Sequence, residues 1–165
     1  MKNLLPWLFC CLIALPVVGT AQQVRYLVEC DRGASFVANA THRTDGTILV
    51  VGDLGRVGTY KREQGRITWE CLPSQAFLYD VWSRNDTTIV VGESGDVWFI
   101  VEGARWKSSP LPMPDTCRSI AVHNGVVYVG TQEGRIWQRA ALDAEAWTLS
   151  YQASAAVIEL SLIHI

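Results

Sequence analysis

Acidic residues are the side chains of this sequence that come closest to a recognisable chemistry. Two carboxylates that face each other across a bound sugar can hydrolyse a glycosidic bond, and arginines such as Arg56 and Arg118 would suit an acidic sugar. None of the carboxylates lies in a motif that fixes its role, and the sequence has no nucleophile elbow. We therefore predict no catalytic residue. The candidate ligand-binding residues are Asp31, Asp53, Glu93, Asp115 and Glu133.

Three pairs of glycines in VVGDLGR, VVGESGD and YVGTQEGR could be taken for phosphate-binding loops. Such a loop leads from a strand into a helix, so that the helix N-terminus faces the phosphate. Here each pair is followed by another β-rich run, RVGTY, DVWFI or RIWQR. The pairs therefore predict tight hairpin turns, in which a positive φ favours glycine. These glycines are Gly52, Gly55, Gly92, Gly95, Gly130 and Gly134.

The glycine pairs belong to a longer repeat. Their first glycines are 40 and 38 residues apart, and Phe36 aligns with Phe77 at an offset of 41. Each unit closes with a tryptophan, Trp69, Trp106 or Trp147, for which the repetition favours a packing role over a sugar-stacking role. In the second unit, the period-two pattern predicts strands near 78–83, 88–91, 96–100 and 105–107.

Four-stranded antiparallel units of this length are typical of β-propeller blades. We expect an all-β, partial β-propeller over 22–160, with blade repeats near 36–71, 77–107 and 118–150. An immunoglobulin-like sandwich is the alternative, but it would not need the glycine pattern to recur in register.

The first 21 residues have the features of a secretory signal peptide. Lys2 precedes an apolar run of about 15 residues, and the small residues GTA end it, so we expect cleavage after Ala21. A membrane span is the competing interpretation, but the run is shorter than the roughly 20 residues that a span needs. The prediction is a secreted or periplasmic protein with no membrane span after cleavage.

The net charge and the cysteine content bear on whether the protein binds nucleic acid, a metal or a cofactor. The net charge of −2 gives no electrostatic reason to expect nucleic acid. Cys30, Cys71 and Cys117 would remain after cleavage, an odd number in an oxidising setting. Because Cys30 and Cys71 occupy equivalent positions in consecutive blades, we expect them to be too far apart to pair. No cysteine or histidine has the spacing of a metal site, so we predict neither metal nor cofactor.

The ends of the sequence predict a truncated propeller. The segment VRYLVEC at 24–30 matches GRITWEC at 65–71 and indicates an orphan outer strand, while AAVIELSLI at 155–163 indicates an opening strand. Rings of four to eight blades of this size need roughly 160 to 320 residues. We interpret residues 161–165 as a non-native tail. The alternative is a module that completes itself by oligomerising through its cut edges.

The run VVGDLGRVGTYKREQGRITWE resembles blades of the photosystem II assembly-factor-like and sialidase-related (BNR, Asp-box) propellers. It departs from the Asp-box turn at Glu63, which stands where that turn has aspartate. The resemblance implies a protein-binding or assembly scaffold, or alternatively a carbohydrate-active, sialidase-like propeller. The partner would then be a protein or an extracellular glycan. Its binding face would comprise loops 31–35, 72–76 and 110–117 together with turns 53–55, 93–95 and 131–134.

Overall fold

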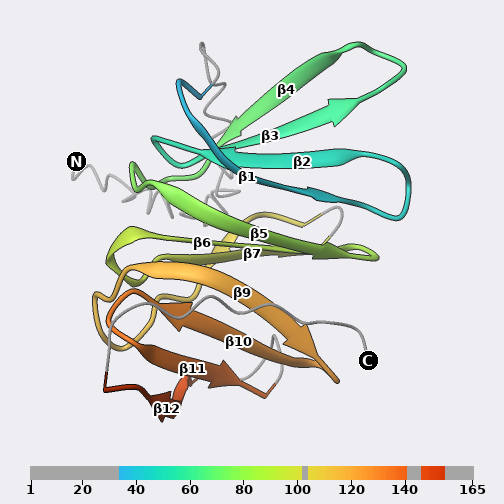
Figure 1. Ribbon diagram of the computed structural model, residues 1–165. Helices are drawn as coiled ribbons and strands as arrows, with labels where there is room; N and C mark the ends of the chain where they lie inside the picture. The colour runs from blue at the N-terminus through green and yellow to red at the C-terminus, as the bar shows by residue number, and fades with distance from the viewer. Residues whose placement is uncertain (1–33, 102–103, 141–145, 155–165) are drawn as a thin grey trace, which may run out of the picture.

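The computed structural model describes residues 34–101, 104–140 and 146–154 of the chain. Three four-stranded antiparallel sheets, each with its strands in chain order, make up this part of the chain. The sheets lie face to face as blades (Figure 1). The predicted all-β partial propeller is therefore confirmed. The predicted signal peptide, orphan strand, opening strand and tail lie outside the described residues.

Each blade is built from four consecutive strands. Blade 1 comprises β1 (Val37–His42), β2 (Ile48–Gly52), β3 (Arg56–Lys61) and β4 (Arg66–Cys71). Blade 2 comprises β5 (Leu78–Arg84), β6 (Thr87–Gly92), β7 (Val97–Val101) and β8 (Lys107–Ser108), with the 3₁₀ turn η1 (Glu93–Gly95) after β6. Blade 3 comprises β9 (Cys117–His123), β10 (Val126–Thr131), β11 (Arg135–Arg139) and β12 (Thr148–Gln152). The four strands predicted for the second unit match β5 to β8 within two residues.

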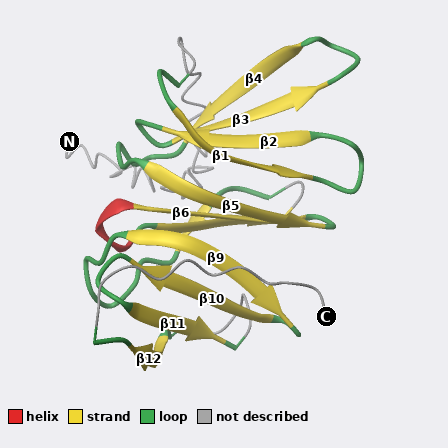
Figure 2. Cartoon of the chain, in the orientation of Figure 1, coloured by secondary structure: helices red, strands yellow, loops and turns green. Residues whose placement is uncertain are grey.

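Among the described residues the turn η1 is the only helical element (Figure 2), and no helix there is long and apolar enough to cross a membrane.

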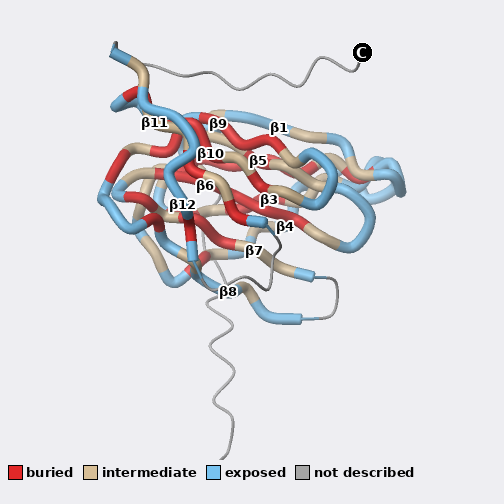
Figure 3. Tube along the Cα trace, turned by 90° about the horizontal axis from the view of Figure 1, so that it is seen from below, coloured by how far each residue is buried: buried red, intermediate tan, exposed pale blue. Residues whose placement is uncertain are grey.

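Two apolar cores hold the blades together, one on each side of blade 2. Side chains alternate across a strand, so Val90 of β6 packs into the core shared with blade 1, and Ile89 and Val91 pack into the core shared with blade 3. All three are buried, which explains why β6 is apolar without alternation. Figure 3 shows the buried stretches in the middle of the stack, whereas the outer strand β12 is exposed.

Tryptophans near the outer strands join consecutive blades. The Trp106 indole N–H donates to the Glu70 carboxylate of β4 at 3.0 Å, and Trp106 packs against the core between blades 1 and 2. The Trp147 indole N–H donates to the Ser109 carbonyl at 2.9 Å, and Trp147 is buried in the core between blades 2 and 3. Trp69 is half-buried on blade 1. In blades 2 and 3 the tryptophan thus reaches back to the preceding blade.

In the first two glycine pairs, the first glycine is required by close packing. The sequence analysis had expected a requirement for positive φ. Gly92 has an extended φ of −154°, so the expectation of positive φ is wrong for it. A Cβ atom on Gly52 would lie 1.9 Å from the Phe36 carbonyl oxygen, and one on Gly92 would lie 2.5 Å from that of Phe77. The first glycine therefore permits the start of the inner strand to approach the turn.

The second glycine has the expected positive φ and binds the segment that links two blades. Gly55 has a φ of 65°; its N–H donates to the Ala76 carbonyl at 2.8 Å, and its carbonyl accepts from the Leu72 N–H at 2.9 Å. Gly95, with a φ of 75°, makes the same pair of bonds to Asp115 and Leu111. Each of these turns is thereby fixed to the linker of the following blade.

Replacing Gly55 by alanine tests this interpretation. A Cβ atom there would lie 2.1 Å from the Ser74 carbonyl oxygen, whereas Gly65 has a similar φ of 60° and nothing within 4 Å of its Cβ position. We expect Gly65→Ala to lower the free energy of unfolding by about 1 kcal/mol through backbone strain alone, and Gly55→Ala to lower it by about 3 kcal/mol or more. Urea unfolding measures both values, and equal losses would contradict the close approach.

Candidate functional site

One end of the blades gathers the turns and linkers that the sequence analysis assigned to a binding face. We call this end the turn face: it comprises turns 53–55, 93–95 and 132–134 and segments 34–36, 72–77 and 109–116. Backbone hydrogen bonds from Gly55 and Gly95 fix the first two turns to the blade linkers, and the Gly134 carbonyl accepts from the Ala153 N–H at 2.7 Å. The face is therefore a fixed surface and not a set of independent loops.

Three of the predicted ligand-binding acids repeat one structural role on this face. The Asp53 carboxylate accepts from the Ser35 N–H at 2.9 Å, that of Glu93 from the Phe77 N–H at 3.2 Å, and that of Glu133 from the Thr116 N–H at 3.1 Å. Each carboxylate thus binds the backbone at or just before the start of the inner strand of its own blade. Such bonds keep a negative charge in place near the surface.

Asp115 is the buried member of the predicted set, with a side chain that is about 5% exposed. Its Oδ1 atom lies 2.6 Å from the Arg135 guanidinium, and its Oδ2 atom accepts from the Trp137 indole N–H at 3.3 Å. Asp31 lies outside the described residues. Within the described part of the chain no hydrogen bond or ion pair joins one of the predicted acids to another, so the structure groups them on one face without forming a carboxylate pair.

A β-bulge lies near the start of each inner strand, between Val37 and Asn39, between Leu78 and Asp80, and opposite Gly130 and Thr131. A bulge inserts an extra residue and redirects its side chain. In blades 2 and 3 the extra residues are Tyr79 and Arg118. The Tyr79 hydroxyl donates to Glu93 at 3.3 Å, and the Arg118 Nε–H donates to Gln132 at 3.0 Å. Both bulge side chains therefore reach the turn face.

These side chains continue a row of stacked groups that crosses all three blades, which we call the aromatic ladder: Phe36, Phe77, Tyr79 and Arg118. The ring centroids of Phe36 and Phe77 are 5.5 Å apart, and those of Phe77 and Tyr79 are 4.8 Å apart. The Arg118 guanidinium lies 4.0 Å from the Tyr79 centroid, a cation–π contact. The Phe36 side chain is 58% exposed and Arg118 is exposed, so the ladder is open to a ligand.

Asp80 fixes the inner strands that carry the ladder. Its Oδ1 atom accepts from the Asn39 side-chain amide at 2.7 Å, and its Oδ2 atom accepts from the Ile120 backbone N–H at 2.9 Å. One carboxylate of β5 thus binds β1 on one side and β9 on the other. Because charge-assisted hydrogen bonds are among the stronger ones, this arrangement sets the spacing of the ladder groups.

The sequence analysis did not identify the ladder as a site. The only signal was the equivalence of Phe36 and Phe77 in the repeat. Arg118 was noted only as an arginine that would suit an acidic sugar. Tyr79 gave no signal, because a bulge arises from strand pairing and has no residue type of its own. Among the described residues, no group of three or more histidines, cysteines or acids is arranged to hold a metal.

Two of the three predicted mature cysteines lie within the described residues. Cys71 forms a disulfide. The second cysteine of this disulfide and Cys30 both lie outside the described residues, so the prediction that Cys30 and Cys71 do not pair stays untested. Cys117 is free and buried beside the turn face. Burial, with the neighbouring Asp115 carboxylate, raises the pKa of the Cys117 thiol far above its ordinary value.

Solved structures with the same fold include β-propeller proteins. The chain is similar to a catalytically inactive virginiamycin B lyase from Staphylococcus aureus with quinupristin, with a TM-score of 0.64 and 13% identity over 76% of this chain and 44% of that one. It is similar to YCF48 bound to D1 peptide, with a TM-score of 0.63 and 19% identity over 73% and 41% of the two chains. It is also similar to the computationally designed Ika8 protein, with a TM-score of 0.62 and 11% identity over 78% and 40%.

These similarities establish the fold and not an activity, because the identities are low. The chain spans about two fifths of the length of these structures. No protein-family model matches the sequence, and the comparison with curated proteins found no match.

Asp115 provides a test of the turn-face packing. We expect Asp115→Asn to lower the free energy of unfolding by about 2 kcal/mol or more, because the Arg135 guanidinium would lose its buried counter-charge. Asp53→Asn is the matched control: Asp53 is more exposed than Asp115 and lies 3.9 Å from Arg56, and we expect this more distant pair to contribute less than about 1 kcal/mol. Urea unfolding compares the two, and a larger loss for Asp53→Asn would contradict this assignment.

Cys117 provides a second test. A buried thiol with a raised pKa presents almost no reactive thiolate at pH 8. We expect iodoacetamide to leave Cys117 unmodified in the folded chain and to alkylate it in 8 M urea, as measured by mass spectrometry of the peptide that contains it. Alkylation of the folded chain at the rate of a free thiol would show that this region opens readily.

Proposed function

We propose that this chain is part of an exported, non-enzymatic β-propeller that serves as a protein-binding or assembly scaffold through the aromatic ladder. The observation that carries the proposal is the ladder itself, a strip of aromatic groups that ends in an exposed cation and crosses three blades. Rings and arginines are the groups that contribute most to protein interfaces.

The surroundings of the ladder suit an extended peptide. Leu54 at the tip of one turn and Met113 in one linker are also exposed apolar side chains on the turn face. Exposed apolar groups bordered by charge are typical of interaction surfaces. Apolar side chains of a peptide could pack on the Phe36 and Phe77 rings, while the Arg118 guanidinium would pair with an acidic group.

The similar structures include one protein with a bound peptide and one enzyme, so they do not choose between a scaffold and an enzyme. YCF48 was solved bound to a peptide, whereas virginiamycin B lyase is an enzyme on the same fold. The turn-face carboxylates favour a scaffold over an enzyme, because all of them already have partners. Those of Asp53, Glu93 and Glu133 bind backbone N–H groups, and that of Asp115 binds Arg135. The resemblance to photosystem II assembly-factor-like and BNR propellers, and export through the first 21 residues, belong to the same proposal.

A carbohydrate-active propeller is the second candidate. Sugar rings stack on aromatic side chains, and the half-buried Glu93 carboxylate lies within hydrogen-bond distance of Tyr79 in the ladder. A sugar on this strip would therefore meet both a ring and an acid. Both candidates place the ligand on the aromatic ladder. The same ladder variants therefore test whether a peptide or a sugar binds there and not elsewhere on the chain.

A displayed library of random peptides tests the scaffold. We expect the chain to select peptides that combine apolar and acidic residues, and Phe36→Ser or Arg118→Gln to weaken their binding at least about tenfold. Leu149→Ser is the matched control, because Leu149 is an exposed apolar residue on the outer strand β12. Binding that both ladder variants leave unchanged would overturn the proposal. Selection of glycans and no peptides on an array would favour the second candidate.

A further inference from the structure

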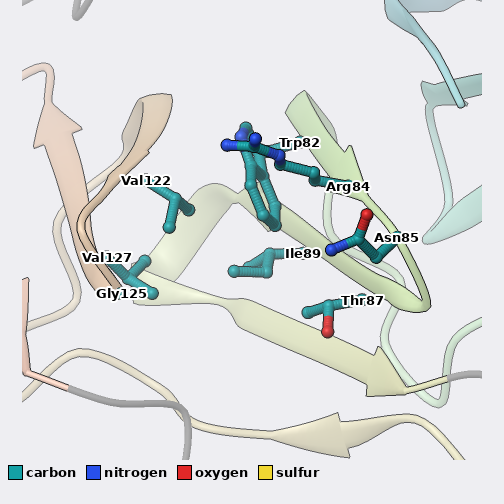
Figure 4. Close-up of a pocket in the computed structure, with 8 residues that line it drawn as sticks. All are labelled: Trp82, Arg84, Asn85, Thr87, Ile89, Val122, Gly125 and Val127. Atoms are coloured by element: carbon teal, nitrogen blue, oxygen red, sulfur yellow. The ribbon is translucent and has the colours of Figure 1, made fainter. Parts of the chain in front are cut away.

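A pocket lies between blades 2 and 3 at the opposite end of the blades from the turn face, where the β5–β6 and β9–β10 turns lie. We call it the inter-blade pocket (Figure 4). Ile89, Val122 and Val127 form its apolar lining, the Trp82 ring stands beside Ile89, and Arg84 and Asn85 lie at the β5–β6 hairpin end. Its volume of about 200 Å³ suits one ring or one branched side chain.

The pocket lies between two equivalent hairpins of the same length. Beyond its bulge, the β5–β6 hairpin has five residue pairs, from Asp80–Val91 to Arg84–Thr87. The β9–β10 hairpin also has five, from Ser119–Gly130 to His123–Val126. The two hairpins therefore end at equivalent pairs, and Trp82 in the pocket between them is half-buried.

The interface between blades 1 and 2 has a contact at the position equivalent to Arg84. Arg43 follows β1 and occupies the position equivalent to Arg84, at an offset of 41. The Arg43 guanidinium donates to the Asn85 carbonyl of the next blade at 3.4 Å. Arg84 is exposed and has no hydrogen bond or ion pair within the described part of the chain. This guanidinium is therefore available to a ligand.

We propose that the inter-blade pocket binds a single aromatic or branched aliphatic group that carries a carboxylate. The apolar part would lie on Ile89, Val122 and Val127 against the Trp82 ring. The carboxylate would pair with the Arg84 guanidinium, whose planar pair of N–H donors matches its two oxygens. The Asn85 side-chain amide is a second donor in the pocket lining. The pocket is separate from the turn face, so its occupancy does not depend on the ladder.

The acid 3-phenylpropionate is the probe for this proposal. With the ¹⁵N-labelled full chain, we expect a saturable shift of the Trp82 indole N–H signal, assigned by its loss in Trp82→Phe. The uncharged 3-phenylpropanamide should bind at least about tenfold more weakly, because a hydrogen-bonded charge pair is lost. Arg84→Gln should weaken the acid by a similar factor and leave the amide unchanged. Arg62→Gln, another exposed arginine on a hairpin, is the matched control and should change neither.

A tripeptide Ala-Ala-Phe with a free carboxyl end distinguishes the two sources of such a group. Tighter binding than 3-phenylpropionate would identify the end of a polypeptide, and equal or weaker binding would identify a free acid. The absence of a saturable Trp82 shift would overturn the proposal. It would also be overturned if the acid and the amide bound equally, or if Arg84→Gln bound the acid like the unmodified chain. Because Arg84 is exposed, its variant should keep the melting temperature of the unmodified chain, which checks that a loss of binding is not a loss of fold.

Discussion

The contact between a glycine turn and the following blade linker is the constraint on which the rest of the structure depends. The carbonyls of Gly55 and Gly95 accept from Leu72 and Leu111, so each blade is bound to the backbone that leads to the next. Backbone groups can meet this closely only where no Cβ intervenes. The two apolar cores then form between blades whose relative position the turns have already limited.

The same constraint produces the turn face. Once a turn is held against the start of an inner strand, its acid lies within reach of a free backbone N–H, as Asp53 and Glu93 show. The bulges near these strand starts redirect Tyr79 and Arg118 toward the turns, and Asp80 holds the inner strands at a fixed spacing. A continuous row of rings and a guanidinium is the result, although no single blade contains it.

Departures from the repeat are where the blades acquire different surfaces. Arg43 and Arg84 are equivalent by sequence, yet one binds the next blade and the other is exposed. In a stack of similar units most equivalent positions are used for packing, and a side chain without a partner in the next blade stays available at the surface.

The sequence by itself determined the all-β class, the four-stranded repeat units and the positions of the hairpin turns, because strand periodicity and turn glycines are local signals that the repeat presents three times. It also grouped Asp53, Glu93 and Glu133 on one face, since their turns are equivalent. Only the tertiary structure decided that the first glycines serve close approach, that Tyr79 and Arg118 join the phenylalanines, and that Arg84 lies beside a pocket. These features arise from strand register and from contacts between blades, which residues 40 positions apart create only after folding.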